Sequence, residues 1–485
     1  MTLAHRGLAK HSVGTAGLGL LAVSASAPMT VLVGGIISSY AATGVVGVPL
    51  SFLVLGGALA LFAVGYIAMS RDVPNAASFY AFLALGIGRS AGVAGAVVAL
   101  IAYNAIQISL YGLFGATLSA FLGGNWWVWA LVGWLVIAIL GILHIQVNTR
   151  LLAAVLAVEL LIIAMFDIAG FLAPAEGRLD FAPLMPNSLV TDGLGGVLAF
   201  GVAAFIGFET VTVYREEAPT HDAIVRACFG TLAFLSIFYA VSGWAMAMAT
   251  GPDNVVDAAR SASSELPFTV LDSYYGPFVS VVGQVLLVTG VFASLLSFHN
   301  VVARYIYGLA RERILPSRLR AIGGTSGGVP IAGSIAQSIT ALATVVFFAA
   351  LGADPLAALF TWLSTLAALG VLGLMVASSI AVVRFYRTRE HRPPAWKRVV
   401  APIAGAVSLM CILAITIVNI DSLTNSGSET ALKWILPLIV IVAASVGLLW
   451  AARLHHRQPG VYATIGRGEP KPLAVLERAL ADLEV

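Results

Sequence analysis

Long uncharged stretches alternate with short charged connections along the chain. No Asp, Glu, Lys or Arg occurs from His11 to Ser70 or from Ser90 to Thr149, and only Asp354 interrupts the run from Ala321 to Val383. A helix needs about 20 apolar residues to cross the hydrocarbon core of a bilayer, so each stretch is long enough for two spans. Helices are favoured over barrel strands because lipid cannot satisfy backbone polar groups and the segments lack a two-residue alternation.

The pattern therefore predicts an all-α membrane protein with about twelve transmembrane helices. Their approximate ranges are 13–38, 46–69, 91–121, 126–146, 150–172, 193–214, 226–250, 277–310, 330–351, 355–383, 399–420 and 434–452.

Composition agrees with a chain that lies mostly in lipid. Of 485 residues, 59% are hydrophobic and 10% are charged, whereas charged residues make up about 25% of a typical soluble domain. The two cysteines, Cys228 and Cys411, lie in apolar spans without metal-ligand spacing, so neither a disulfide nor a metal site is expected. No cofactor motif and no ATP-binding glycine loop is found, which argues against an ATP-driven pump.

Basic residues gather on alternate connections. Only Arg178, Arg260 and Lys433 lie on one set of connections, and nearly all other Lys and Arg lie on the opposite set or in the tails. By the positive-inside rule, this asymmetry predicts an even number of spans and cytoplasmic N- and C-termini in a bacterial inner membrane. The first apolar run is too long for a signal-peptide core and lacks a cleavage site, so it is expected to remain as the first span.

Two spans contain residues that interrupt helices. The first, GTAGLGLLAVSASAPMTVLVGGII, places Pro28 near its centre, where proline removes a backbone donor and disturbs the preceding turn. The sixth, GGVLAFGVAAFIGFETVTVY, contains Gly201, Gly207 and the acidic Glu209. One break is also explained as a simple kink, but breaks at matching places five spans apart point to a transporter site near the membrane midplane.

Four segments resemble motifs of the amino acid–polyamine–organocation (APC) permeases. They are MSRDVPNAASFYAFLALGIGRSAG after the second span, FIGFETVTVYREEAPTHDAI in and after the sixth, NVVARYIYGLARERILPSRL after the eighth, and GGVPIAG before the ninth. Each motif is weak by itself, but their order and span positions are specific, and the resemblance covers nearly the whole chain.

The resemblance implies a LeuT-like fold of two inverted five-helix repeats plus two further helices. The corresponding divisions are a cytoplasmic N-tail at 1–12, repeat 1 at 13–172, repeat 2 at 193–386, two further spans at 399–453 and a cytoplasmic C-tail at 454–485. Substrate would then sit between the broken first and sixth helices, where half-helix ends favour opposite charges.

Carried over residue by residue, the resemblance implies a set of substrate-binding positions in the first, third, sixth and eighth spans. They are Ser26, Ala27, Met29, Thr30, Tyr103, Gln107, Ala203, Phe205, Ile206 and Phe298. Helix–helix packing is the alternative explanation for the polar residues of the third span, since amide side chains also join helices.

The chain departs from the family pattern at two places, one in the first span and one in the sixth. Pro28, Met29 and Thr30 replace the common Gly-Ser-Gly of the first helix, and a similar Pro-Met-Thr occurs in putrescine-importing members. Because proline has no amide proton, a substrate carboxylate would have to use neighbouring amides. Ala203 replaces the tryptophan of arginine/agmatine exchangers, which argues against a stacked guanidinium substrate.

Three titratable residues inside spans are candidate ion-coupling groups: Glu159, Glu209 and His299. A charge at mid-bilayer costs at least about 2.5–3.5 kcal/mol, so such a residue is seldom kept without a partner or a role. Glu159 either exchanges a proton during transport or is a permanently protonated acid bonded to the first helix. Glu209 either pairs with exposed carbonyls in its protonated form or only satisfies the broken backbone, and His299 is either a proton relay or a packing residue.

The coupling ion has two candidates. Protons are favoured by Glu159, while the hydroxyls of Ser24, Ser294 and Ser297 keep a sodium site open, although small serines are equally ordinary at helix contacts.

We expect a secondary active transporter that imports amino acids with protons by alternating access. The alternative within transport is a polyamine or small-amine importer or exchanger of the same fold, with sodium coupling not excluded. A membrane-embedded enzyme is the alternative from another class, but it would need clustered metal ligands or a nucleophile–base set, and the sequence contains no recognisable pattern of either kind. Besides the small-molecule substrate and membrane lipid, no protein or nucleic-acid partner is expected.

Overall fold

The structure is a computed structural model that describes residues 13–143, 145–323, 328–390, 392–424 and 431–468. Within these ranges the chain is helical throughout, with no strand and a single isolated bridge between Gly323 and Val329. The expected N-tail at 1–12 and the end of the C-tail from 469 lie outside the described residues.

The first half of the chain forms one broken and several continuous helices. In order they are α1 (Thr15–Ala25), α2 (Pro28–Thr30), η1 (Val31–Ile36), α3 (Ile37–Thr43), α4 (Val48–Asp72), α5 (Ser78–Gly86), α6 (Arg89–Leu122), α7 (Trp126–Leu140), α8 (Ile145–Leu172), η2 (Ala182–Leu184) and α9 (Pro186–Leu189).

The second half repeats the pattern of a broken helix followed by long ones. Its elements are α10 (Leu194–Ala203), η3 (Phe208–Tyr214), α11 (His221–Thr250), α12 (Val255–Ala262), η4 (Ser263–Glu265), α13 (Leu266–Tyr275), α14 (Pro277–Arg311), η5 (Ser317–Arg320), α15 (Ile331–Ala350), η6 (Pro355–Phe360), α16 (Thr361–Arg387), η7 (Trp396–Val400), α17 (Ala401–Val418), α18 (Ile420–Leu423), α19 (Leu432–Arg457) and α20 (Pro459–Thr464).

Eleven helical segments among the described residues are long and apolar enough to cross a membrane, which confirms the predicted multi-pass all-α class. The remaining predicted span, 126–146, is the shorter apolar helix α7, which has 15 residues and ends at Leu140. At 1.5 Å per residue α7 is roughly 22 Å long, less than the roughly 30 Å hydrocarbon thickness.

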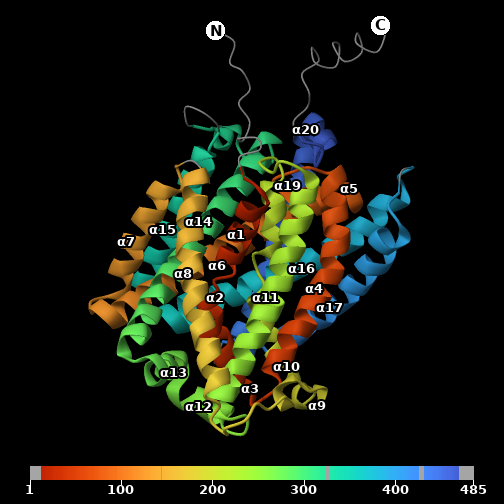
Figure 1. Cartoon of the computed structure of the whole chain (residues 1–485). Coiled ribbons are helices and arrows are strands. Elements are labelled where there is room, and N and C mark those ends of the chain that lie inside the picture. The colour runs from red at the N-terminus through yellow and green to blue at the C-terminus, as the bar shows by residue number, and fades with distance from the viewer. Residues whose placement is uncertain (1–12, 144, 324–327, 391, 425–430, 469–485) are drawn as a thin grey trace.

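The helices form one bundle with two distinct ends (Figure 1). α5 and α20 lie at one end, which we call the α20 face, and α9, α12 and α13 lie at the other, which we call the α12 face. The first and sixth spans are largely buried in the bundle, whereas α15, α17 and α19 expose most of their apolar side chains. A lipid environment makes such an apolar exterior stable.

Polar side chains at the bundle ends fix the turns between helices. Asp354, the one acidic residue in a long uncharged stretch, accepts hydrogen bonds from the amides of Leu356 and Ala357 and so caps η6. On the α12 face, Arg260 of α12 donates to the carbonyl of Ala41 and ties this surface helix to the end of the first span.

The segment after α20 docks on the α20 face through one buried carboxyl group. The amide of Gly466 donates to Glu312 Oε2 at 2.8 Å, and Tyr80 of α5 and Asn75 also donate to the Glu312 carboxyl group. Burial raises the pKa of Glu312 above its ordinary value, although its hydrogen-bond donors oppose this shift. The C-terminal segment thereby joins α5 to the end of α14.

Close helix packing at α16 can be tested with a pair of glycines on the same helix. A Cβ at Gly370 would lie 2.8 Å from the Cβ of Ala102 on α6, so Gly370→Ala should destabilise the protein by roughly 1–3 kcal/mol. A Cβ at Gly373 would have no other atom within 4 Å. Gly373→Ala should therefore be neutral or stabilising by up to about 1 kcal/mol. Thermal unfolding in detergent measures both, and equal losses would contradict the packing.

Candidate functional site

The first span breaks between α1 and α2. α1 ends at Ala25, and Ala27 has a φ of 47°, a left-handed conformation that costs a residue with a side chain roughly 1–3 kcal/mol. Pro28 follows the break directly and is the first residue of α2, so the turn that it disturbs is the one before it. Proline fits there because the first turn of a helix needs no amide donor.

The sixth span breaks directly beside the first. α10 ends at Ala203, and η3 begins after Gly207, whose φ of 122° is accessible only to glycine at low cost. A Cβ at Gly207 would lie 2.8 Å from the Cβ of Ala25, so a side chain here would collide with the end of α1. The two predicted interruptions are therefore confirmed as breaks and pack against each other.

Glu159 of α8 binds the start of α2, where the first break leaves a backbone amide without a helical partner. Its Oε1 accepts a hydrogen bond of 2.6 Å from the amide of Met29, the second residue of α2. The carboxyl group is buried and occupies space beside Gly290, where a Cβ would lie within 3 Å of it. A helix N-terminus stabilises a carboxylate, so the position suits the charged form as well as a hydrogen-bonded acid.

Glu209 performs the equivalent function at the second break. Its Oε2 accepts from the amide of Gly207 at 3.0 Å, and its Oε1 accepts from the hydroxyl of Tyr103 on α6 at 3.1 Å. The predicted substrate position Tyr103 is thus a buried partner of Glu209.

Hydroxyl groups of α14 donate to carbonyls of α1, one of them at its end. Ser294 of α14 donates to the carbonyl of Ala25, and Ser297 donates to that of Leu21, both at 2.8 Å. The Ser24 hydroxyl is buried without a hydrogen-bond partner. These serines occupy the positions named for a sodium site, and the side-chain hydroxyls of two of them donate to backbone carbonyls.

A cavity of about 230 Å³ extends from the two breaks toward the α12 face. Its walls include Ser38 of α3, Phe360 of η6 and Leu423 of α18, which lie on the α12 side of the breaks. Seven hydroxyl side chains line it, and no described lining residue is charged. Charges on a bound solute would therefore be met by backbone groups and hydroxyls.

Six of the ten predicted substrate residues line this cavity: Ser26, Ala27, Thr30, Ala203, Ile206 and Phe298. The side-chain hydroxyl of Thr30 is buried with no partner, so it is free to bind a solute.

The other four predicted substrate residues do not line the cavity. Met29 binds Glu159 through its amide, and Tyr103 binds Glu209. Gln107 accepts from Gln337 of α15 and donates to Tyr111, while the ring of Phe205 packs at a tilt against Phe52 and edge-on against Tyr239. For Gln107, the helix-joining explanation accounts for the contact with Gln337, while the contact with Tyr111 lies within α6.

His299 does not line the cavity either. Its Nε2 lies 2.7 Å from the Ser334 hydroxyl of α15, and Gly141 leaves no room for a side chain beside the ring.

The contribution of α16 to the cavity wall was not predicted from the sequence. Thr361, Ser364 and Thr365 line the cavity from the start of this helix. Their spacing of three and four residues places hydroxyls on one helix face, a periodic signal that was visible in the sequence.

Ion pairs on the other side of the breaks close the bundle toward the α20 face. Arg304 of α14 binds both carboxylate oxygens of Glu217 at 2.6 and 2.9 Å, with side chains only 2% and 1% exposed. Tyr214 stacks below the guanidinium, and Arg311 pairs with the neighbouring Glu216. The segment after the sixth span is thereby fastened to α14.

These features define a multi-pass helical membrane protein with a solute-sized cavity at two opposed helix breaks. A family model described as amino acid permease matches residues 18–444, and the chain belongs to this family within the APC superfamily. It is thus a transporter of amino acids or amine-type solutes. No curated protein matches the chain.

The Glu217–Arg304 pair can be separated from its neighbour by mutation. Glu217→Gln leaves the buried Arg304 charge uncompensated and should cost about 3–5 kcal/mol of unfolding free energy. Glu216→Gln affects a pair whose side chains are 14% and 20% exposed and should cost less. Unfolding in detergent measures both, and the double variant Glu217→Leu with Arg304→Met should recover much of the loss. Equal effects of the two single changes would contradict the buried-pair assignment.

Proposed function

We propose that this permease imports a small amino acid by alternating access, coupled to protons, across a bacterial inner membrane with both termini cytoplasmic. The observation that carries the proposal is the pair of opposed breaks with a carboxyl group bound at each one. The α20 face is then cytoplasmic, and the cavity faces the outside. The buried pairs around Arg304 are the contacts that separate when the cavity opens inward.

The repeat relation supports the alternating-access part of the proposal. Each predicted half begins with a broken helix, α1–α2 in one and α10–η3 in the other, and the two breaks pack together at one depth. In inverted-repeat transporters, discontinuous helices form the solute site and one group of helices rocks against the other. We assign the same LeuT-like arrangement to this chain.

We prefer protons over sodium as the coupling ion because of the hydrogen bonds that the candidate residues form. Glu159 and Glu209 each contact a backbone amide at a break, where a change in protonation alters the charge next to the solute. The hydroxyls of Ser294 and Ser297 donate to the carbonyls that a sodium ion would need. Gain of a proton on Glu159 would weaken its hydrogen bond with the Met29 amide and release this amide as a donor for a substrate carboxylate, and loss of the proton would restore the bond.

A small-amine substrate is the second candidate, and the occupied Met29 amide favours it. Pro28 has no amide proton, and Glu159 holds the Met29 amide, so few donors remain at the start of α2 for a substrate carboxylate. A cation lacking a carboxylate needs none of these donors and would be attracted by the two nearby acidic groups.

Uptake into proteoliposomes tests both the substrate class and the coupling. A panel of labelled amino acids and polyamines, each with an imposed proton or sodium gradient, should give proton-driven accumulation of a small neutral amino acid. Accumulation of polyamines alone would select the second candidate, and a requirement for sodium would refute proton coupling.

Glu159→Gln should abolish proton-driven accumulation while exchange of internal for external substrate continues, since the amide side chain cannot release a proton. Asp167→Asn is the matched control because Asp167 is a buried acid on the same helix that accepts from Ser242, away from the breaks. Accumulation by Glu159→Gln at the wild-type level would remove Glu159 from the coupling mechanism.

A further inference from the structure

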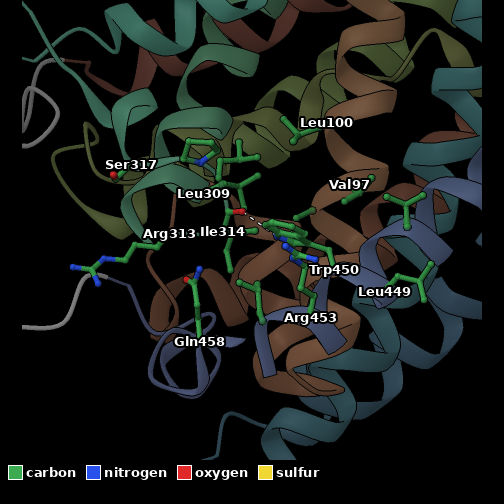
Figure 2. A pocket seen from close by; sticks show the side chains of 15 residues that line it. Val97, Leu100, Leu309, Arg313, Ile314, Ser317, Leu449, Trp450, Arg453 and Gln458 are labelled. Atoms are coloured by element: carbon green, nitrogen blue, oxygen red, sulfur yellow. Dashed lines mark hydrogen bonds between the residues drawn. The ribbon is translucent and has the colours of Figure 1, made fainter. Parts of the chain in front are cut away.

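A second, larger hollow lies at the periphery of the bundle, apart from the central cavity. It has a volume of about 840 Å³ and is bounded by α6, the end of α14 with the loop that follows it, and α19. Figure 2 shows Val97 and Leu100 of α6, Leu309 of α14, and Leu449 and Trp450 of α19 around it. We call this hollow the α6–α19 groove.

The wall of the groove continues onto the lipid-facing surface. Leu449 is 71% exposed and Trp450 is 40% exposed, although both belong to a membrane-spanning helix. Exposed apolar side chains on a membrane-spanning helix contact acyl chains in a bilayer. The groove is therefore open to lipid from the side.

The end of the groove at the α20 face is basic. Arg313 follows α14, and Arg453 lies one turn beyond Trp450 on α19; among the described residues neither forms an ion pair or a side-chain hydrogen bond, and both are exposed. No acidic residue is among the described residues that line the groove. Gln458 and Ser317 add uncharged polar groups at the same end, as Figure 2 shows.

Arg313 also occupies a position that normally selects glycine. Its φ is 62°, and the amide of Ile314 donates to the carbonyl of Leu309, the pattern of a helix C-terminus closed by a left-handed residue. A residue with a side chain costs roughly 1–3 kcal/mol in such a conformation. The Trp450 indole donates to the carbonyl of Ile314 at 3.1 Å and holds this strained turn against α19 (Figure 2).

We propose that the α6–α19 groove binds an anionic phospholipid from the leaflet on the α20 face. The phosphate group binds at the basic end beside Arg453, the Arg313 side chain turns toward it from the loop after α14, and an acyl chain lies along the apolar side chains of α6 and α19. Guanidinium groups are strong phosphate donors, and basic pockets between transmembrane helices favour anionic headgroups. A free phosphate ion would use the arginines but would leave the apolar wall uncovered, so the groove favours the lipid.

A bound lipid would join α6, α14 and α19 at one point. α14 also carries Ser294 and Phe298 at the central cavity, and α6 carries Tyr103, the partner of Glu209. The site would therefore stabilise the helices that surround the proposed transport pathway without depending on which solute is carried.

Native mass spectrometry of the purified full-length protein tests the proposal directly. With an equal mixture of phosphatidylglycerol and phosphatidylcholine, the wild type should retain phosphatidylglycerol preferentially. Arg313→Gly combined with Arg453→Ala should reduce that preference roughly 10- to 30-fold, because two basic contacts are lost. The glycine also relieves the strained turn, so poor folding is not expected from that change.

The matched control is Arg318→Ala combined with Arg457→Ala. These arginines lie near the same turn and on the same helix, but outside the groove lining, and their removal changes the net charge equally. An equal loss of preference in the control would show general attraction to anionic lipid and overturn the specific site. Competition by glycerol phosphate as strong as that by phosphatidylglycerol would also overturn it, since the acyl chain would then contribute nothing.

Discussion

Unpaired backbone groups inside a membrane are the constraint on which the rest of this structure depends. Breaking two membrane-spanning helices frees amides and carbonyls that lipid cannot satisfy. The protein supplies side-chain partners instead: Glu159 for Met29, Glu209 for Gly207, and Ser294 and Ser297 for the carbonyls of α1. Because these partners come from α8, η3 and α14, satisfying the breaks also determines which helices surround them.

The same arrangement explains why the two sides of the breaks differ. Toward the α12 face, small and hydroxylated side chains leave a cavity, whereas toward the α20 face the space is filled by tyrosines and the Glu217–Arg304 pair. Buried ion pairs contribute little net stability, but removing one partner leaves a buried charge uncompensated and is costly. Such pairs are therefore suitable as contacts that either form or separate as a unit. The C-terminal segment at Glu312 and the basic end of the α6–α19 groove lie on this closed side.

The candidate site was predictable in part, and the limits have a physical cause. Ser26, Thr30 and Ala203 line the cavity because they lie in or next to the breaks, where local sequence determines the backbone. Gln107 does not line it, because the side of α6 that faces the cavity depends on its packing against α15 through Gln337. The hydroxyls of α16 were not predicted because the expected substrate positions came only from the first, third, sixth and eighth spans.

The sequence by itself determined the membrane class, the approximate spans and the two interrupted helices, since these follow from charge-free length and from glycine and proline positions. It did not determine that α7 would end at Leu140, or that Pro28 would start a helix segment rather than lie within the break. Only the tertiary structure brought Glu159 to the amide of Met29 and Glu217 to Arg304, across 130 and 87 residues of chain. Such pairings depend on how helices distant in sequence pack, and no local pattern records that arrangement.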